Sequence, residues 1–158
     1  MKEKNASLEE FIGSESEKYY EVTERDIKRF AQAIDDPDLL YSDSEYAGNT
    51  EHGGIIAPAL FCQTMAYDDI PVDQLKRDGS PKEIDAPLPT ERVLGGGSKF
   101  IIGESVRPGD RIKVRKKVID VYQKKGKSGL LYFVVIENLW TNQLGEMVAQ
   151  ETATYIHR

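Results

Sequence analysis

The chain has 158 residues, enough for one domain with a real hydrophobic core, and it carries 21 Lys and Arg against 27 Asp and Glu, a formal net charge of −6. An acidic balance argues against a nucleic-acid partner, because a nucleic-acid surface needs a basic patch. No apolar run reaches the length of a membrane span, so a membrane is not an expected partner either.

Cysteine and histidine are scarce. Cys62 is the single cysteine and cannot form an internal disulfide, and His52 and His157 lie far apart without a metal-ligand spacing. We therefore expect no metal site and no cofactor. The N-terminus has no apolar signal core, so a cytoplasmic protein is the expectation.

The first elements are short. Residues 1–17 are polar and charged, and we take residues 18–158 as a single domain. The stretch Ser7 to Glu10 has the Ser-x-x-Glu form of a capping box, which favours one helical turn. Tyr19 to Val22 is typical of a short strand.

A helix follows this strand. Thr23 is a typical N-cap residue, and an acidic residue three positions on, Asp26, favours the positive end of a helix. Apolar residues then recur at helical spacing and predict one buried face: Ile27, Phe30, Ala31 and Ile34. The helix should end by Asp36, because a residue before proline avoids the α region.

The stretch from Asp35 to Tyr67 organises the chain. An acidic loop leads to Gly53 and Gly54, and then to a segment that is free of charge from Ala59 to Ala66. Such a segment predicts a buried helix, with Pro58 at its first position. The free N–H of Ala59 would then suit a carbonyl oxygen that gains negative charge. A plain buried core helix is the alternative.

The connection at about 67–90 is polar and rich in proline. A loop of this length either lines a site or is flexible surface. One helical turn is expected within it, from Val72 to Lys76.

The chain from Glu91 onward is predicted to be β. The strands expected are Ser98 to Ile102, Arg111 to Gln123, Leu130 to Thr141 and Met147 to His157, with hairpins at 126–129 and 142–145. Glycines 95–97 have the wrong spacing for a phosphate loop, so a bulge or a close backbone approach is predicted there.

The middle strand, Leu130 to Thr141, is apolar on both faces, which predicts cover on both. The buried helix would cover one face. A second subunit is the economical cover for the other, and the long connection folding over it is the competing interpretation.

A helix followed by an antiparallel sheet wrapped around one buried central helix indicates an α+β hot-dog fold. The sequence also resembles the MaoC-like hydratase/dehydratase family, in its fatty-acid-synthase-like dehydratase N-terminal branch. The family motif Gly-Asp-x-Asn-Pro-Ile-His-x-Asp corresponds to residues 35–43, and Gly-Gly-x-Ile-Ala-His-Gly to residues 53–59. Residues 106–110 resemble the Val-Arg-x-Gly-Asp segment before the hairpin strands, and the match spans roughly residues 12–156.

The resemblance implies site residues and one departure. The family's catalytic Asp falls on Asp36, whereas its catalytic His falls on Tyr41. Tyrosine is a poor base at neutral pH, because its pKa is near ~10 against ~6.5 for histidine. His52 is a further candidate for the missing imidazole, and the backbone of Gly53, Gly54 and Ala59 is implied in substrate binding.

The implied function is a subunit of an (R)-specific enoyl-thioester hydratase or 3-hydroxyacyl-thioester dehydratase. Its ligand would be an acyl-CoA or acyl-ACP thioester, and its assembly a homodimer or a heterodimer with a second MaoC-like chain. Two alternatives stay open: a non-catalytic acyl-binding or scaffolding half of a heterodimeric hydratase, and a hot-dog acyl-CoA thioesterase.

Overall fold

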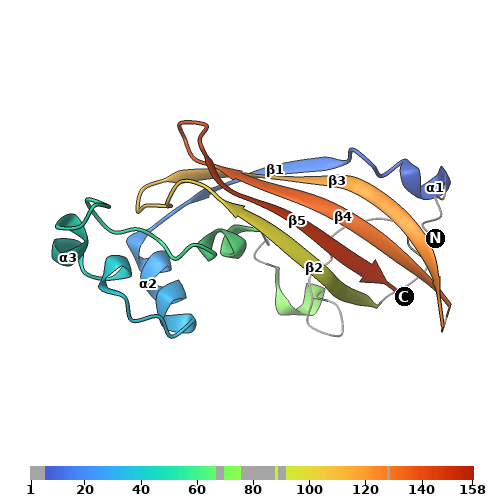
Figure 1. Cartoon of the computed structure of the whole chain (residues 1–158), viewed down its shortest axis with the longest axis horizontal. Coiled ribbons are helices and arrows are strands. Elements are labelled where there is room, and N and C mark those ends of the chain that lie inside the picture. The colour runs from blue at the N-terminus through green and yellow to red at the C-terminus, as the bar shows by residue number, and fades with distance from the viewer. Residues whose placement is uncertain (1–5, 67–69, 76–87, 89–91, 128) are drawn as a thin grey trace.

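The computed structural model describes residues 6–66, 70–75, 88, 92–127 and 129–158 (Figure 1). The helices are α1 (Ala6–Glu9), α2 (Glu24–Ala33) and α3 (Ser44–Gly48), and the 3₁₀ helices are η1 (Leu39–Tyr41), η2 (Phe61–Met65) and η3 (Val72–Gln74). The strands are β1 (Glu15–Glu21), β2 (Val93–Ile102), β3 (Arg111–Gly126), β4 (Gly129–Thr141) and β5 (Met147–His157). None of the helices described is long and apolar enough to cross a membrane.

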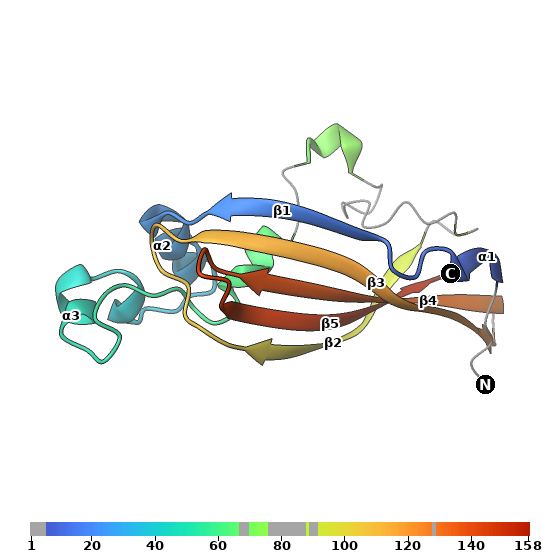
Figure 2. The ribbon, with the colours of Figure 1, turned by 90° about the horizontal axis from the view of Figure 1, so that it is seen from above.

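The five strands form one antiparallel sheet in the order β1-β3-β4-β5-β2 (Figure 2). The sheet curves over η2, while α2 and α3 lie beyond one end of the strands and α1 lies at the other (Figure 1). The predicted hairpins at 126–129 and 142–145 are confirmed, as is the antiparallel sheet. The strand predicted at 19–22 begins earlier, at Glu15, within the segment expected to be a polar N-terminus.

Helix α2 begins where its capping sequence predicts. The Thr23 side chain accepts from the Asp26 amide, the Asp26 side chain accepts from the Thr23 amide, and Ile27 and Ala31 are buried. The prediction that Ile34 lies on the buried face is wrong, since its side chain is 50% exposed. Ile34 is the C-cap residue, where the backbone leaves the helical path and carries the side chain off the stripe.

The central segment is buried on one side only. Phe61, Cys62 and Met65 are each 1% exposed, as predicted, whereas Ala59, Leu60 and Thr64 are exposed, so the prediction of a helix buried all round is wrong. Its helix is shorter than the predicted span of Pro58 to about Tyr67 and is 3₁₀ rather than α, and Tyr67 lies outside the described residues. Two side chains also bond to carbonyls of this segment. Cys62 Sγ donates to the Ala59 carbonyl and Thr64 Oγ1 to the Phe61 carbonyl.

The two faces of β4 differ in burial. Val134, Ile136, Asn138 and Trp140 alternate along the strand as the buried set. The opposite face is half-buried, and at its centre Glu137 accepts from Arg115 at 3.2 Å and from Gln150 at 2.8 Å. Hence one face of β4 packs in the core, whereas the other combines apolar side chains with the hydrogen-bonded set Arg115, Glu137 and Gln150.

The glycine-rich start of β2 is a bulge, as predicted. The register with β5 shifts between Gly95 and Gly97. A Cβ added at Gly96 would lie 3.0 Å from the Thr154 carbonyl oxygen, so the two backbones approach too closely for a side chain. In the long connection, η3 confirms a helical turn after Pro71, and residues 76–87 and 89–91 lie outside the described residues.

Candidate active site

The site predicted from the sequence lies in the segment between α2 and η2. Helix α2 ends in a Schellman motif, in which the Asp35 N–H donates to the Gln32 carbonyl and the Asp36 N–H donates to the Ala31 carbonyl at 2.9 Å. Asp35 takes the left-handed position with φ 55°, a place usually given to glycine. This motif fixes the direction of the backbone at Asp36.

Asp36 is half-buried and helps to shape the turn that follows it. Its Oδ1 accepts from the Asp38 amide at 3.2 Å, and Asp38 in turn caps η1 by accepting from the Leu40 amide at 2.9 Å. Asp36 therefore has the structural role of a turn residue, and its carboxylate remains free to accept further hydrogen bonds through its second oxygen.

Tyr41 lies at the end of η1, half-buried against the main apolar cluster. Burial raises the pKa of Tyr41 above 10.0, and the nearby charges of Asp36 and Asp38 raise it further. The phenol consequently stays protonated at neutral pH. It can donate a hydrogen bond toward the carboxylates or a bound ligand, but it cannot serve as a base there.

His52 lies in the turns between α3 and Gly53. Its amide donates to Thr50 Oγ1 at 3.3 Å and its side chain is half-buried. No hydrogen bond or ion pair joins its imidazole to Asp36 or Tyr41. Within the described residues, the charge of Asp36 therefore acts on the Tyr41 phenol, and Asp36 has no bond to an imidazole.

Gly53 and Gly54 both have positive φ, 64° and 157°, which permits the sharp turn into the buried run 55–58. The Ala57 amide donates to the Val106 carbonyl at 2.8 Å and joins this run to the loop between β2 and β3. A Cβ added at Gly54 would lie 3.9 Å from Nη1 of Arg107, so a guanidinium stands close to this glycine.

Ala59 is exposed, and within the described part of the chain its N–H has no acceptor. Pro58 precedes η2 and accepts the first 3₁₀ bond, from the Phe61 amide at 2.8 Å. The predicted donor is therefore present, in the turn just ahead of the helix rather than within its first turn. A five-residue 3₁₀ helix adds little dipole to it.

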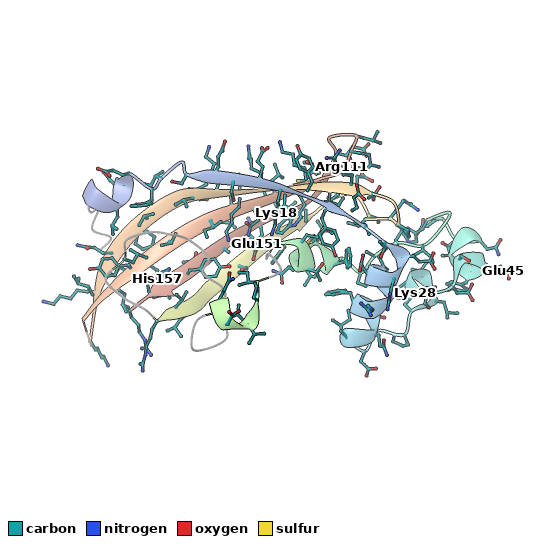
Figure 3. All side chains as sticks on the ribbon, turned by 180° about the vertical axis from the view of Figure 1, so that it is seen from behind. Lys18, Lys28, Glu45, Arg111, Glu151 and His157 are labelled. Atoms are coloured by element: carbon teal, nitrogen blue, oxygen red, sulfur yellow. The ribbon has the colours of Figure 1, made fainter. Side chains whose placement is uncertain are left out.

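A pocket of about 290 Å³ opens between α2 and the acidic loop. It is lined by Lys28, Ala31, Gln32, Asp35, Asp36, Pro37, Asp38 and Ser42. Lys28 already pairs with Glu24 at 2.6 Å, and Figure 3 shows it on α2. Of the predicted site residues, only Asp36 lines this pocket. Tyr41, Gly53, Gly54, Ala59 and His52 do not.

No group of three His, Cys, Asp or Glu side chains in the described residues is arranged to hold a metal ion. Sequence reasoning did miss one polar feature, the pair Asn138 and Glu151, each only 4% exposed. A signal was available, because Asn138 stands between Ile136 and Trp140 in the inward alternation of β4, and Glu151 between Ala149 and Ala153 in β5.

Comparisons with known proteins identify the family and the fold. The family model for the FAS1-like, dehydratase domain region matches residues 10–151. The UPF0336 protein of Streptomyces avermitilis is 30% identical over 107 residues, which cover 68% of this chain and 67% of that protein. The "probable enoyl-CoA hydratase alpha subunit" of Thermomonospora curvata is 28% identical, covering 79% of this chain and 41% of that protein.

Among solved structures, this chain is similar to the C-terminally truncated HadBC complex, a 3R-hydroxyacyl-ACP dehydratase of Mycobacterium tuberculosis. The TM-score is 0.70 at 21% identity, covering 92% of this chain and 96% of that one. MaoC-like dehydratases recur among the similar structures, which confirms the predicted hot-dog fold.

Proposed function

Because the chain belongs to the FAS1-like dehydratase domain family, we propose that it is a subunit of an (R)-specific enoyl-thioester hydratase or 3-hydroxyacyl-thioester dehydratase. Its ligand would be an acyl-CoA or acyl-ACP thioester. Its partner would be a second MaoC-like chain, and the two-chain HadBC dehydratase supports an assembly of this kind.

The chemistry assigns a task to each residue. Hydration of an enoyl thioester needs a water that is held and deprotonated, a proton for C2, and donors for the thioester oxygen as it gains charge. Asp36 can accept from the water, the protonated Tyr41 can donate, and the unpaired Ala59 N–H can hold the oxygen. The Arg107 guanidinium near Gly54 adds positive charge on the same segment.

The observation that supports the proposal is a tyrosine, Tyr41, near the charges of Asp36 and Asp38 at the position where the family has its histidine. A phenol whose pKa is raised by burial and by two carboxylates cannot replace an imidazole as the base. We therefore infer that this chain shapes the thioester site and that the partner supplies the histidine. The same observation favours the second candidate, a non-catalytic acyl-binding half.

One assay distinguishes a hydratase subunit from a non-catalytic acyl-binding half. The purified chain is given a short enoyl-CoA, alone and with a MaoC-like chain that carries both Asp and His, and the loss of the enoyl absorbance is followed. The lone chain should be slow or inactive, since a missing general base costs about 10²- to 10⁴-fold. The partner should restore that factor, and Asp36→Asn in this chain should lower the restored rate only if Asp36 takes part.

Three variants complete the test. Tyr41→His should raise the activity of the lone chain, whereas His52→Ala, the matched control, should leave it unchanged. Strong activity of the lone wild type that is lost on Tyr41→Phe would make Tyr41 the catalyst and contradict the proposal. If strong activity of the lone chain were lost on His52→Ala instead, His52 would be the general base. Release of free CoA thiol without hydration would instead indicate a thioesterase.

A further inference from the structure

Three segments of the chain meet beside η1, and hydrogen bonds join them. The Ile56 N–H donates to the Leu40 carbonyl of η1 at 3.3 Å. The next amide but none between, that of Ala57, donates to the Val106 carbonyl in the loop between β2 and β3 at 2.8 Å. Because Leu40 precedes Tyr41 in the chain, this junction adjoins the candidate active site.

Two consecutive backbone N–H groups at the junction have no acceptor. Those of Gly54 and Ile55 make no hydrogen bond to any described residue, although Gly54 is half-buried and Ile55 is 6% exposed. The positive φ angles of Gly53 and Gly54, 64° and 157°, turn the backbone at this point. Successive N–H groups in such a turn form a concave site for anions. Because unpaired backbone donors are costly to bury, these two need an acceptor from outside the chain, a water or a bound anion.

A guanidinium group lies against the same turn. A Cβ added at Gly54 would lie 3.9 Å from Nη1 of Arg107, an exposed residue. Within the described part of the chain, this guanidinium has no ion pair and no hydrogen bond. Since a Cβ lies ~2.5 Å from its own backbone nitrogen, Nη1 is within about 6.5 Å of the Gly54 nitrogen. Two oxygens of one anion can therefore reach both donors at ~2.8–2.9 Å.

The backbone that carries Arg107 is held in place by its loop. The Arg107 N–H donates to Asp110 Oδ2 at 2.7 Å, and Asp110 Oδ1 accepts from Gln143 Nε2 at 2.9 Å. The Gly109 N–H also donates to the Val22 carbonyl at 2.8 Å, just before α2. Both oxygens of Asp110 thus hold the loop, and the Arg107 guanidinium is available to a ligand at a fixed base, which lowers the entropy lost on binding.

The surrounding segment is acidic. Residues 35–60 include six Asp and Glu and no Lys or Arg. A cation that attracts an anion to this segment therefore has to come from elsewhere in the fold, and Arg107 is placed to supply it. Lys28, which lines the neighbouring pocket, is already paired with Glu24.

This set of donors matches a phosphoryl group. A planar guanidinium binds phosphate through two parallel hydrogen bonds, and backbone N–H groups of a concave turn bind further phosphate oxygens. A thioester carbonyl, in contrast, offers one oxygen without a full charge. The carriers of acyl groups considered above, CoA and the acyl carrier protein, both bear a phosphate on pantetheine.

We propose that Gly54, Ile55 and Arg107 bind a phosphoryl group of the carrier that bears the acyl thioester. This inference rests on the proposed function, because it takes the ligand to be an acyl-CoA or acyl-ACP thioester. It adds the part of the carrier that the chain recognises and the residues that hold it.

The test measures binding of three hexanoyl thioesters, those of CoA, phosphopantetheine and pantetheine, by isothermal titration calorimetry. The full chain is used, together with its hydratase partner where one is needed. The ligands share one saturated acyl group, which cannot be hydrated, and differ in their phosphates. The two phosphorylated ligands should bind about 10- to 100-fold more tightly than hexanoyl-pantetheine, the size of a hydrogen bond to a charged group.

Variants assign this difference to Arg107. Arg107→Gln should abolish the preference for the phosphorylated ligands and leave hexanoyl-pantetheine unchanged, whereas Arg107→Lys, which keeps the charge but not the planar fork, should restore part of it. Arg111→Gln is the matched control and should change nothing, because the Arg111 guanidinium lies over the Tyr19 ring at 4.7 Å (Figure 3).

The pattern of losses identifies the phosphate. A loss on Arg107→Gln for both phosphorylated ligands supports the proposal and assigns the pantetheine phosphate that both carriers share. A loss for hexanoyl-CoA alone also supports it and assigns a nucleotide phosphate of CoA. Unchanged binding of both ligands, or an equal loss for hexanoyl-pantetheine, would overturn this inference and leave the proposed function standing. If the wild type bound none of the three thioesters, the proposed function would fail as well.

Discussion

Phe61→Ala tests the packing of η2, because this side chain is 1% exposed and meets Phe30 edge to face at 5.6 Å and 80°. Truncating a buried Phe typically costs ~3–5 kcal/mol, since transfer and cavity terms add. The aromatic pair accounts for ~0.5–1.5 kcal/mol of that loss. We expect the free energy of unfolding to fall by about 4 kcal/mol, a large part of the ~5–15 kcal/mol typical of a domain.

The assay is urea denaturation followed by intrinsic fluorescence. Trp140 is the single tryptophan and is fully buried, so its emission reports exposure of the core directly. Leu60→Ala is the matched control, because Leu60 is adjacent and 46% exposed, and it should cost under ~1 kcal/mol. A cycle with Phe30→Ala should return a coupling within the range expected for an aromatic pair.

Equal losses for Phe61→Ala and Leu60→Ala would refute the reasoning. They would mean that η2 does not pack under the sheet, and the position of the Ala59 amide would then lose its support. A large loss without coupling to Phe30 would confirm the burial but not the contact with α2.

Three further predictions concern association, pH and the end of α2. The purified chain should not be monomeric, and Ile101→Lys on the edge strand β2, where Ile101 is 48% exposed, should dissociate the assembly in sedimentation velocity. Val72→Lys, at a side chain that is 85% exposed, is the control and should leave the assembly intact. A stable wild-type monomer at micromolar concentration would contradict this prediction. Burial raises the pKa of the Cys62 thiol from 9.0 to about 11, with the charge of Glu151 adding to the effect. The folded state thus holds the thiol proton to higher pH than the unfolded chain, so this contribution to stability is full below pH 9 and is lost as the pH rises toward about 11. Cys62→Ala should remove this part of the pH dependence in denaturation series. If the free energy of unfolding of the variant depends on pH as that of the wild type does, the thiol makes no such contribution. Asp35→Gly should raise the free energy of unfolding by up to ~1 kcal/mol, because Asp35 has φ 55°, and a loss of stability would show that its side chain contributes more than its backbone strain costs.

The hydrophobic periodicity and the turn and capping residues of the sequence predicted much of the fold. The strand spans predicted at 111–123, 130–141 and 147–157 and the Thr23 cap depend on residues close in sequence, and all were confirmed. The 3₁₀ form of η2 could not be predicted in the same way. A segment without charged residues predicts burial but does not distinguish a 3₁₀ helix from an α-helix.

The candidate site was predictable in composition but not in geometry. Asp36 and Tyr41 were identified from the sequence, whereas their proximity depends on the Schellman turn at Asp35 and on the cap of η1. Asn138 and Glu151 are ordinary strand residues in sequence, and only the register of β4 with β5 brings them together.

The order of the strands also has a consequence for folding. β3, β4 and β5 are joined by tight hairpins, so their pairing closes short loops. In contrast, Tyr20 on β1 pairs with Ile112 on β3, and this contact must close a loop of about 90 residues. Asp36, Tyr41 and Ala59 all lie within that loop. We therefore expect the meander to form first and the first strand to dock late, so that the candidate site is assembled only when the sheet is complete.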